Sequence, residues 1–406
     1  MNKDNSLSRR KFLSEIVSKA GVVGGIGLLP SCIGIWSHIN GVKQRIETVT
    51  YNDDNNKQKD LTFGIWYPTP KYDEVNNLNS KLPLIGFSHG FGGSPWVYET
   101  LLSEMSLAGN VVVAPQHHDL YNLLTTNGII QFNLEELKEQ IDYIIEELRN
   151  ITGYENATLD DVINHIFCED ILTGIIRDGG FIQDFRDFFK PRVKEIDVAM
   201  DTARIMNINP DSYIFGKIDS EKTGISGHSL GGSVVIEKIN PDGELYDSKI
   251  NAALLLSPAS GFYDASSVLI PTRFITGTLD DEVFRDSFYK SFQQVTGPSS
   301  FINFRNVGHL SFANEACALL DTFRIFFKSG EKSLNIKYTV HNKSKEKQVK
   351  LFTEDDLAAV ENHEEKTAAI CNASNCFMGY WIKKQGSEDA FLNNYSYMVD
   401  AYEKRN

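Results

Sequence analysis

Residues 222–235 read KTGISGHSLGGSVV, in which a short apolar run is followed by small residues and then by a second apolar run. The G-x-S-x-G pattern at 227–231 is typical of a tight turn between a buried strand and a helix, where small flanking residues let neighbouring backbone approach and the serine is pushed outward. The pattern alone is weak, because it can arise by chance. Its position between a strand-like run and a helix-like run makes it specific. We therefore expect a strand, a sharp turn at Ser229 and a helix.

Short apolar runs rich in strand-forming residues recur on both sides of this turn. Together with it they cover residues 45–52, 61–68, 83–88, 110–115, 222–228, 250–257, 272–277 and 300–306. The middle runs are continuously apolar, as in strands buried on both faces of a parallel sheet. Apolar residues at helical spacing separate many of them, for example from Leu134 to Leu148 behind the candidate N-cap Asn133. The alternation predicts an α/β fold with a mostly parallel eight-stranded sheet and helices on both faces.

The predicted domain covers residues 45–330, and a helical insertion at 119–210 lies between its fourth and fifth strands. A helix near 192–206 closes this insertion. The aromatic stretch 175–189 fits helices packed on the sheet, which we favour, or a lid over a site. Residues 331–406 begin polar and lysine-rich, and we expect them to form a C-terminal extension.

Composition and charge exclude several classes of protein. The chain has 406 residues, with 54 acidic and 40 basic side chains and a net charge of −14. Such a chain has no broad positive field for phosphates, so we expect no nucleic-acid binding. Hydrophobic residues make up 41% and charged residues 23%, which is ordinary for a globular protein and disfavours both disorder and a membrane bundle.

Residues 1–31 resemble an export signal. Residues 8–13 read SRRKFL, and a short glycine-rich apolar run follows at 20–29. A basic segment before a short apolar one is typical of secretion signals, and the arginine pair resembles the bacterial twin-arginine type. The apolar run is too short for a membrane-spanning helix, which needs ~20 residues.

The end of this segment resembles a bacterial lipoprotein cleavage box. Residues 29–32 read LPSC, and Cys32 would then carry the lipid. We expect export to the bacterial cell envelope or periplasm, with the membrane as a partner through an N-terminal lipid anchor on Cys32. An ordinary cleaved signal with an incidental cysteine is the alternative, and Pro30 is an unusual residue inside such a box.

Four cysteines follow Cys32, and the sequence leaves their pairing open. Export permits disulfides, and Cys371 and Cys376 are close enough to close a small loop. Cys168 and Cys317 allow other pairings. No cysteines and histidines have the spacing of a zinc site, and we expect neither a metal nor another cofactor.

A serine is a poor nucleophile unless a base takes its proton and an acid orients that base. In a strand–turn–helix arrangement of this kind, the order along the chain is serine, acid, histidine. Three histidines follow Ser229: His309, His341 and His363. Because His309 directly follows the last strand-like run, a loop can carry its imidazole to the serine. The other two lie in the polar extension, so His309 is the predicted base.

The acid is expected just after the run at 272–277. Asp280 and Asp281 both lie there, and we prefer Asp280 because the chain reaches it first after the strand. His228 adjoins the serine, but its side chain points elsewhere in such a turn, so we expect it to pack.

Acyl transfer also needs N–H groups for the developing oxyanion. Residues 88–93 read SHGFGG and follow the third strand-like run, where a glycine-rich turn can aim a backbone N–H at the site. Phe91 is the candidate donor there, and Leu230, which follows the nucleophile, supplies the second N–H. Phe91 and Trp96 are candidates for lining a substrate pocket. No Gly-Lys-Ser/Thr follows this turn, which disfavours a nucleotide-binding loop.

These segments resemble a known family. Residues 87–119, FSHGFGGSPWVYETLLSEMSLAGNVVVAPQHHD, are similar to the third and fourth strands of the plasma-type platelet-activating-factor acetylhydrolases and of related bacterial dienelactone-hydrolase-like esterases. RVKEIDVAMD at 192–201 and IDSEKTGISGHSLGGSVV at 218–235 resemble the run into their nucleophile. The resemblance covers much of 83–311 in patches, and 331–406 falls outside it.

The resemblance implies an α/β-hydrolase fold, metal-independent ester hydrolysis and a triad of Ser229, Asp280 and His309. It also implies that Phe91 and Leu230 supply the oxyanion N–H groups. Dienelactone hydrolases themselves use a cysteine where this chain has Ser229, which argues against lactone substrates. Polyester-degrading cutinases share the serine turn and an aromatic residue after the first glycine of the oxyanion turn, so they are similar as well.

We therefore predict a serine carboxylic-ester hydrolase that works through an acyl-enzyme. The family resemblance implies short or oxidised acyl groups of phospholipids as substrates, whereas the residues by themselves indicate only an acyl ester. One alternative is a cutinase-like or general esterase that acts on polymers or small esters. The other is a non-catalytic binding protein of the cell envelope built on the same scaffold.

Overall fold

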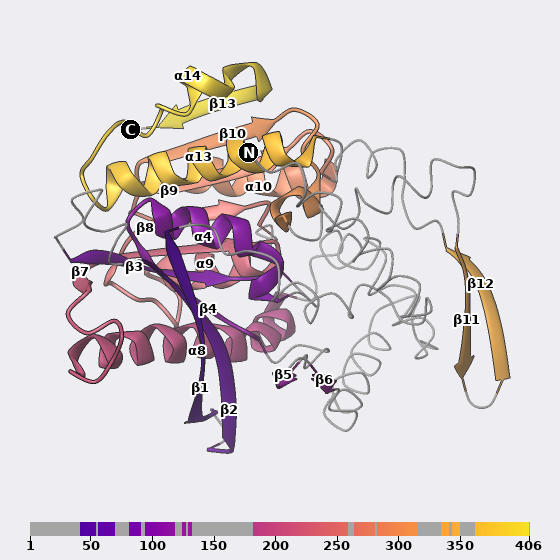
Figure 1. Cartoon of the computed structure of the whole chain (residues 1–406). Coiled ribbons are helices and arrows are strands. Elements are labelled where there is room, and N and C mark those ends of the chain that lie inside the picture. The colour runs from indigo at the N-terminus through magenta and orange to yellow at the C-terminus, as the bar shows by residue number, and fades with distance from the viewer. Residues whose placement is uncertain are drawn as a thin grey trace, which may run out of the picture.

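A mixed sheet of nine strands, counted over the described residues, forms the centre of the structure (Figure 1). The structure, a computed structural model, describes residues 41–53, 56–69, 81–90, 94–117, 124–126, 129–131, 182–258, 264–280, 282–314, 334–340, 343–349 and 362–405. The strands lie side by side in the order β1-β2-β4-β3-β7-β8-β9-β10-β13.

The strands of this sheet are β1 (Val42–Asn52), β2 (Gln58–Pro68), β3 (Leu82–Ser88), β4 (Val111–Pro115), β7 (Ile218–His228), β8 (Ile250–Leu256), β9 (Thr272–Gly277), β10 (Ser299–Phe304) and β13 (Val399–Arg405). The neighbours from β4 to β10 pair in parallel, whereas β1, β2 and β13 pair antiparallel at the two edges. The first eight fall on the eight predicted runs. Their order, with β4 outside β3, confirms the α/β-hydrolase fold.

Helices cover both faces of the sheet (Figure 1). The helical segments are η2 (Pro95–Tyr98), α4 (Glu99–Leu107), α8 (Ile182–Ile208), α9 (Leu230–Ile239), α10 (Glu282–Gln294), η3 (His309–Phe312), α13 (His363–Trp381), α14 (Leu392–Tyr395) and η4 (Ser396–Met398). Two small hairpins, β5 (Leu124–Thr126) with β6 (Ile129–Gln131) and β11 (Leu334–Val340) with β12 (Lys343–Val349), lie outside the sheet.

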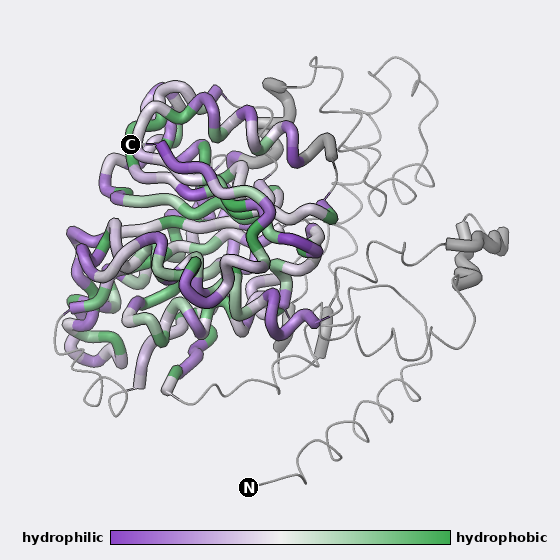
Figure 2. The backbone as a smooth tube through the Cα atoms, turned by 90° about the horizontal axis from the view of Figure 1, so that it is seen from above, coloured by the Kyte–Doolittle hydropathy of each residue, from purple (hydrophilic) through white to green (hydrophobic). Residues whose placement is uncertain are grey.

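The alternation of side chains along each strand divides the core into two layers. In β3, Ile85 and Phe87 belong to the apolar cluster that includes α4 and α13, whereas Leu84 belongs to the cluster that includes α8. On the same face as α8, α9 and α10 cover β8, β9 and β10. Figure 2 shows the resulting distribution, with hydrophobic segments inside and hydrophilic ones around them. The sheet is therefore enclosed, which fits its continuously apolar strands.

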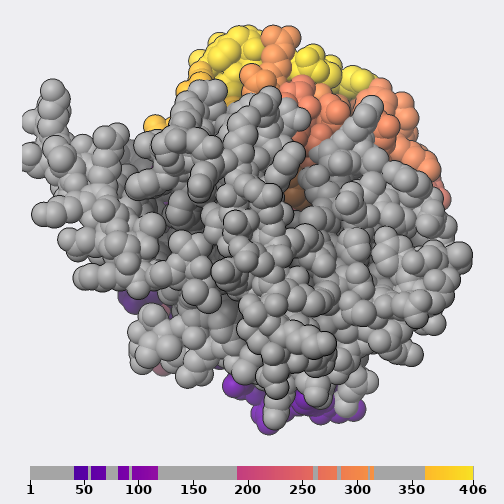
Figure 3. All heavy atoms as spheres, turned by 90° about the vertical axis from the view of Figure 1, so that its right-hand side faces the viewer, coloured from indigo at the N-terminus to yellow at the C-terminus, as the bar shows by residue number. Residues whose placement is uncertain are grey.

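The C-terminal region is more closely joined to the sheet than the sequence predicted. β13 pairs antiparallel with β10 as the ninth strand, and α13 packs in the same apolar cluster as α4. Figure 3 shows this junction on the surface, where the C-terminal residues in yellow lie next to the orange segment. The C-terminal extension predicted after residue 331 thus contacts the sheet and its core through residues 362–405.

The predicted insertion at 119–210 ends in a helix, as expected near 192–206. Its last part is the long helix α8, which packs against β2, β3, β4 and β7 and so covers the sheet itself. The helix expected at 134–148 and the whole aromatic stretch 175–189 lie outside the residues whose side chains are described. The export signal and Cys32 lie outside the described residues as well.

Cys371 and Cys376 are both on α13, and neither forms a disulfide. The small disulfide loop considered from the sequence is therefore not formed, while Cys168 and Cys317 lie outside the described residues. Within the described ranges, no helix is both long and apolar enough to cross a membrane.

Candidate active site

Ser229 lies at the turn between β7 and α9, as predicted. Its backbone has φ 53° and ψ −120°, a conformation that a residue with a side chain rarely adopts. The Ser229 N–H donates to the Leu256 carbonyl at 3.0 Å, and its side chain does not cap the helix that follows. The turn thus holds a strained serine whose hydroxyl is not used by α9.

Two glycines make this turn possible because backbone comes too close for any side chain. A Cβ at Gly227 would lie 2.2 Å from the Gly231 carbonyl oxygen. A Cβ at Gly231 would lie 1.9 Å from the Ser88 carbonyl oxygen, at the end of β3. The G-x-S-x-G pattern therefore has a local steric cause, and it brings the start of α9 against the turn that follows β3.

His309 and Asp280 meet beyond the carboxyl ends of β9 and β10. His309 Nδ1 lies 3.0 Å from Asp280 Oδ1, and the carboxylate is fully buried while 23% of the His309 side chain is exposed. A carboxylate only accepts, so Nδ1 carries the proton and Nε2 is left able to take one. The structure thus brings the predicted base and the preferred acid together, while Asp281 lies outside the described residues.

His228 links the serine turn to His309. It directly precedes Ser229, and its ring centroid lies 4.7 Å from that of His309. His228 Nδ1 lies 2.7 Å from the Tyr98 hydroxyl, and its ring stacks on Phe312. Burial, followed by the nearby His309, lowers the pKa of His228 well below its ordinary value. His228 is thus a buried neutral side chain that packs beside the candidate base, in agreement with the packing role expected for it.

The turn after β3 lies beside the nucleophile. Ser88 pairs with Gly227 in the register of β3 and β7, and a Cβ at Gly90 would lie 3.4 Å from the Ser229 Cβ. Leu230 is the first residue of α9, where backbone N–H groups have no acceptor within the helix. Its N–H is therefore available near Ser229, while Phe91 lies outside the described residues.

Trp96, the other pocket candidate, begins the short helix η2 together with Pro95. It is buried in the apolar cluster of α4 and α13, and its backbone N–H is capped by the Ser94 hydroxyl at 3.4 Å. Its part in lining a substrate pocket stays a prediction.

Sequence reasoning missed a buried polar network behind the turn at 88–90. Arg192 and Glu195 lie one helical turn apart on α8. Arg192 donates directly to carbonyls of this turn, and Glu195 contacts it through His117. Both side chains are almost fully buried. A signal was present, since Arg192 and Glu195 each adjoin an apolar residue, Val193 or Ile196, on the buried side of the helix. Tyr98 was missed because nothing in its sequence context sets it apart from a core tyrosine.

The described residues contain no group of three or more histidine, cysteine, aspartate or glutamate side chains that could hold a metal ion. The described residues bring a strained serine and a paired imidazole and carboxylate to the carboxyl ends of the parallel strands, and nucleophilic catalysis by a serine uses these groups.

Comparison with known proteins gives a partial family match. The family described as platelet-activating factor acetylhydrolase, isoform II, matches residues 59–158, which include β2, β3, α4 and β4. Among solved structures, a ferulic acid esterase from Streptomyces cinnamoneus is similar with a TM-score of 0.49 and 14% identity, over 87% of this chain and 93% of that one. No curated protein matches the sequence. The family match thus falls on the segment that carries the turn at 88–93.

Proposed function

We propose that this protein is a serine carboxylic-ester hydrolase. The observation that carries the proposal is the strained Ser229 turn between β7 and α9, because strained backbone of this kind clusters at active sites. The hydrogen bond between His309 and Asp280 supports it, since the pair lies at the same edge of the sheet. The match of residues 59–158 to an acetylhydrolase family supports ester hydrolysis in particular.

The proposed mechanism assigns one role to each group. His309 Nε2 removes the Ser229 proton while Ser229 Oγ attacks the ester carbonyl, and Asp280 holds the imidazole in the required tautomer and stabilises its cation. The N–H groups of Phe91 and Leu230 receive the oxyanion, aided by the positive end of α9. His309 then protonates the leaving alcohol. Water, deprotonated by the same imidazole, attacks the acyl-enzyme and releases the acid.

For the substrate, we propose short or oxidised acyl groups of phospholipids, on the resemblance of residues 87–119 and 218–235 and on the family match. We further propose that the protein is exported to the bacterial cell envelope and anchored by lipid on Cys32, on the signal-like residues before it. A lipid anchor would place the enzyme close to membrane phospholipid.

Labelling with a fluorophosphonate tests the enzyme class. The parent protein should form a covalent adduct at Ser229, located by mass spectrometry, and Ser229→Ala should form none. Ser233→Ala is a matched control, because Ser233 is a buried serine one turn further along α9 and should leave labelling intact. A folded parent that ignores the probe identifies a non-catalytic binding protein and overturns the proposal.

The substrate class is tested by turnover of a short-chain phospholipid, p-nitrophenyl butyrate and a polyester film in parallel. The proposal expects the highest kcat/KM on the phospholipid. Preference for the film or for the nitrophenyl ester would instead identify a cutinase-like or general esterase. Membrane fractionation of the parent and Cys32→Ser, with a gel shift on loss of the lipid, tests the anchor.

A further inference from the structure

Arg192 holds two successive carbonyl groups of the turn that follows β3. Its guanidinium, on α8 and only 2% exposed as a residue, donates from Nη1 to the His89 carbonyl at 2.7 Å and from Nη2 to the Gly90 carbonyl at 3.1 Å. The planar, two-pronged guanidinium suits this pair of acceptors, which a lysine ammonium could not hold in the same way. One buried side chain thus fixes the direction of both carbonyls.

The direction of a carbonyl sets that of the next N–H. In a trans peptide unit the C=O and the N–H that follows it point in opposite directions. Holding the Gly90 carbonyl therefore constrains the peptide unit that begins at Gly90. Gly90 is also where the turn approaches Ser229, since its Cβ position lies 3.4 Å from the Ser229 Cβ. That peptide unit joins Gly90 to Phe91, whose N–H is the proposed oxyanion donor.

Tyr98 holds the other side of Gly90. The Gly90 N–H donates to the Tyr98 hydroxyl at 3.2 Å, and that hydroxyl lies 2.7 Å from His228 Nδ1. Burial raises the pKa of Tyr98 above its ordinary value, so the phenol keeps its proton and can donate it to His228. The carbonyl and the N–H of Gly90 are therefore both anchored, by Arg192 from α8 and by Tyr98 from η2.

A second set of contacts fixes His89. The His117 N–H donates to His89 Nε2 at 3.1 Å, so His89 carries its proton on Nδ1 and donates it to the Gly90 carbonyl at 2.7 Å. His117 in turn lies 2.8 Å from Glu195 Oε2 on α8 and 2.8 Å from the Ser88 hydroxyl. The turn is thus held by buried groups along its described length.

We propose that Arg192 is a positioning residue for the oxyanion hole, with Tyr98 as its partner: together they orient the peptide unit whose N–H receives the oxyanion. The inference rests on the proposed serine hydrolase function and adds how its oxyanion donor is aimed. The arginine charge also acts through the peptide group, because hydrogen bonds in series polarise one another and strengthen the N–H as a donor. Arg192 touches no reacting atom in this role.

The test compares Arg192→Met and Arg192→Lys with the parent on p-nitrophenyl butyrate. Loss of one oxyanion donor lowers kcat by ~10²–10³-fold in related chemistry, and we expect a loss of this order for Arg192→Met with little change in KM. Arg192→Lys keeps the charge and should recover part of the loss. The affinity for a short alkyl trifluoromethyl ketone, which forms a tetrahedral oxyanion on the serine, should fall in parallel with kcat/KM.

Arg273→Lys is the matched control, because Arg273 is another buried arginine that donates to two backbone carbonyls, here those of Ala373 and Glu388. It should lower the denaturation midpoint and leave both kcat and the ketone affinity of the folded protein unchanged. If it reproduces the kinetic changes of Arg192→Met, general loosening explains them and the inference is wrong.

If Arg192→Met does not fold, Tyr98→Phe tests the positioning role instead. It removes only the hydroxyl that holds the Gly90 N–H and keeps the buried ring. A parallel loss of kcat and ketone affinity supports the inference, and unchanged values overturn it. Fluorophosphonate labelling of the parent separates the two proposals. A labelled, active parent whose folded Arg192→Met variant keeps full kcat disproves the positioning role alone, whereas an unlabelled parent removes the hydrolase function itself.

Discussion

Two buried arginines make the same kind of hydrogen bonds, to pairs of backbone carbonyls, at opposite ends of the parallel strands. Arg192 donates to the carbonyls of His89 and Gly90, in the turn beyond the carboxyl end of β3. Arg273, near the amino end of β9, donates to the carbonyls of Ala373 and Glu388. The acceptors of Arg192 are successive residues of one turn, whereas those of Arg273 belong to α13 and to the chain before α14.

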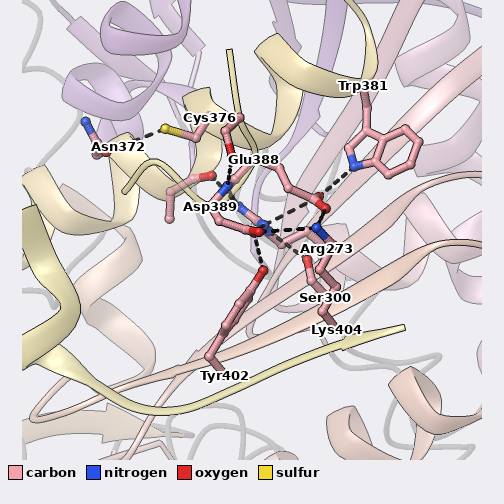
Figure 4. A network of polar contacts seen from close by, with 11 residues as sticks. Arg273, Ser300, Asn372, Cys376, Trp381, Glu388, Asp389, Tyr402 and Lys404 are labelled. Carbon is pink, nitrogen blue, oxygen red and sulfur yellow. Dashed lines mark hydrogen bonds and ion pairs between the residues drawn. The ribbon is translucent and has the colours of Figure 1, made fainter. Parts of the chain in front are cut away.

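The surroundings of Arg273 show what such an interaction does when it serves the fold. Its guanidinium lies over the rings of Phe377 and Phe391, with centroid distances of 5.0 and 5.3 Å, and pairs with Glu388 at 3.6 Å. Figure 4 shows how Trp381, Tyr402 and Lys404 complete this network around Glu388 and Asp389. The network joins the C-terminal helix and strand to the sheet. None of the side chains named in this network is one of the described residues of the candidate site.

The difference indicates that the two ends of the parallel strands differ in what their buried polar groups do. We call these the amino edge and the carboxyl edge of the sheet. At the amino edge, buried polar groups join segments that are far apart in the sequence. Their loss should therefore lower the free energy of unfolding substantially. At the carboxyl edge, they fix a few peptide units and a strained serine, so their loss should change geometry more than stability.

The largest expected effect is a loss of kcat on replacing Ser229, at the carboxyl edge. Ser229→Ala and Ser229→Gly should both lose at least ~10⁴-fold in kcat, since removing a nucleophile of this kind abolishes the triad chemistry. Ser229→Gly should be the more stable of the two by about 1 kcal/mol, because glycine adopts a positive φ without strain. Urea denaturation beside steady-state kinetics measures both, and a glycine variant less stable than the alanine variant would contradict the strain argument.

A large effect of the opposite kind is expected at Arg273. Arg273→Met leaves Glu388 less well paired in a buried site and removes the donors to two carbonyls, so the free energy of unfolding should fall by about 3 kcal/mol or more. The kcat of the protein that remains folded should stay within about twofold of the parent, because additivity holds for distant sites. A fall in kcat with an unchanged urea midpoint would show that the two edges are coupled.

The sequence predicted the sheet well because its strands are marked by local features. Continuous apolar runs with glycine and proline between them gave all eight of the first strands, and the strand–turn–helix pattern around Ser229 placed the nucleophile turn. Asp280 and His309 are in contact and lie a few residues after β9 and β10, where local sequence located them, while their catalytic roles stay a prediction. Each of these features is set by residues near one another in the chain.

What the sequence missed depends on partners distant in the chain. Arg192 is one charged residue on a helix until its acceptors, about a hundred residues earlier, are known to lie beside it. β13 has a polar, strand-like sequence, and only its pairing with β10 makes it part of the sheet. Tertiary contacts decide both cases, and a single sequence does not contain them.

The smallest expected effect is on the pH dependence of the free energy of unfolding, which His228 at the carboxyl edge should influence and Arg273 at the amino edge should not. Burial lowers the pKa of His228 in the folded protein, so between that lowered value and about 6.5 the unfolded chain binds a proton that the folded one does not. The free energy of unfolding must then fall as the pH drops through this window, by up to ~1.4 kcal/mol per pH unit for one proton. Arg273 does not titrate in this range and adds no such slope.

His228→Gln tests this account, because glutamine can still accept a hydrogen bond from the Tyr98 hydroxyl but does not titrate. Urea midpoints measured between pH 7.5 and pH 5.5 should fall more steeply for the parent than for the variant. His89 and His117 are buried in both proteins, so their contributions cancel in the difference. Equal slopes would mean that His228 binds a proton as readily in the folded protein as in the unfolded chain. A second imidazolium would then lie beside His309 and oppose the cation that forms there during catalysis, and the neutral packing role of His228 would have to be abandoned.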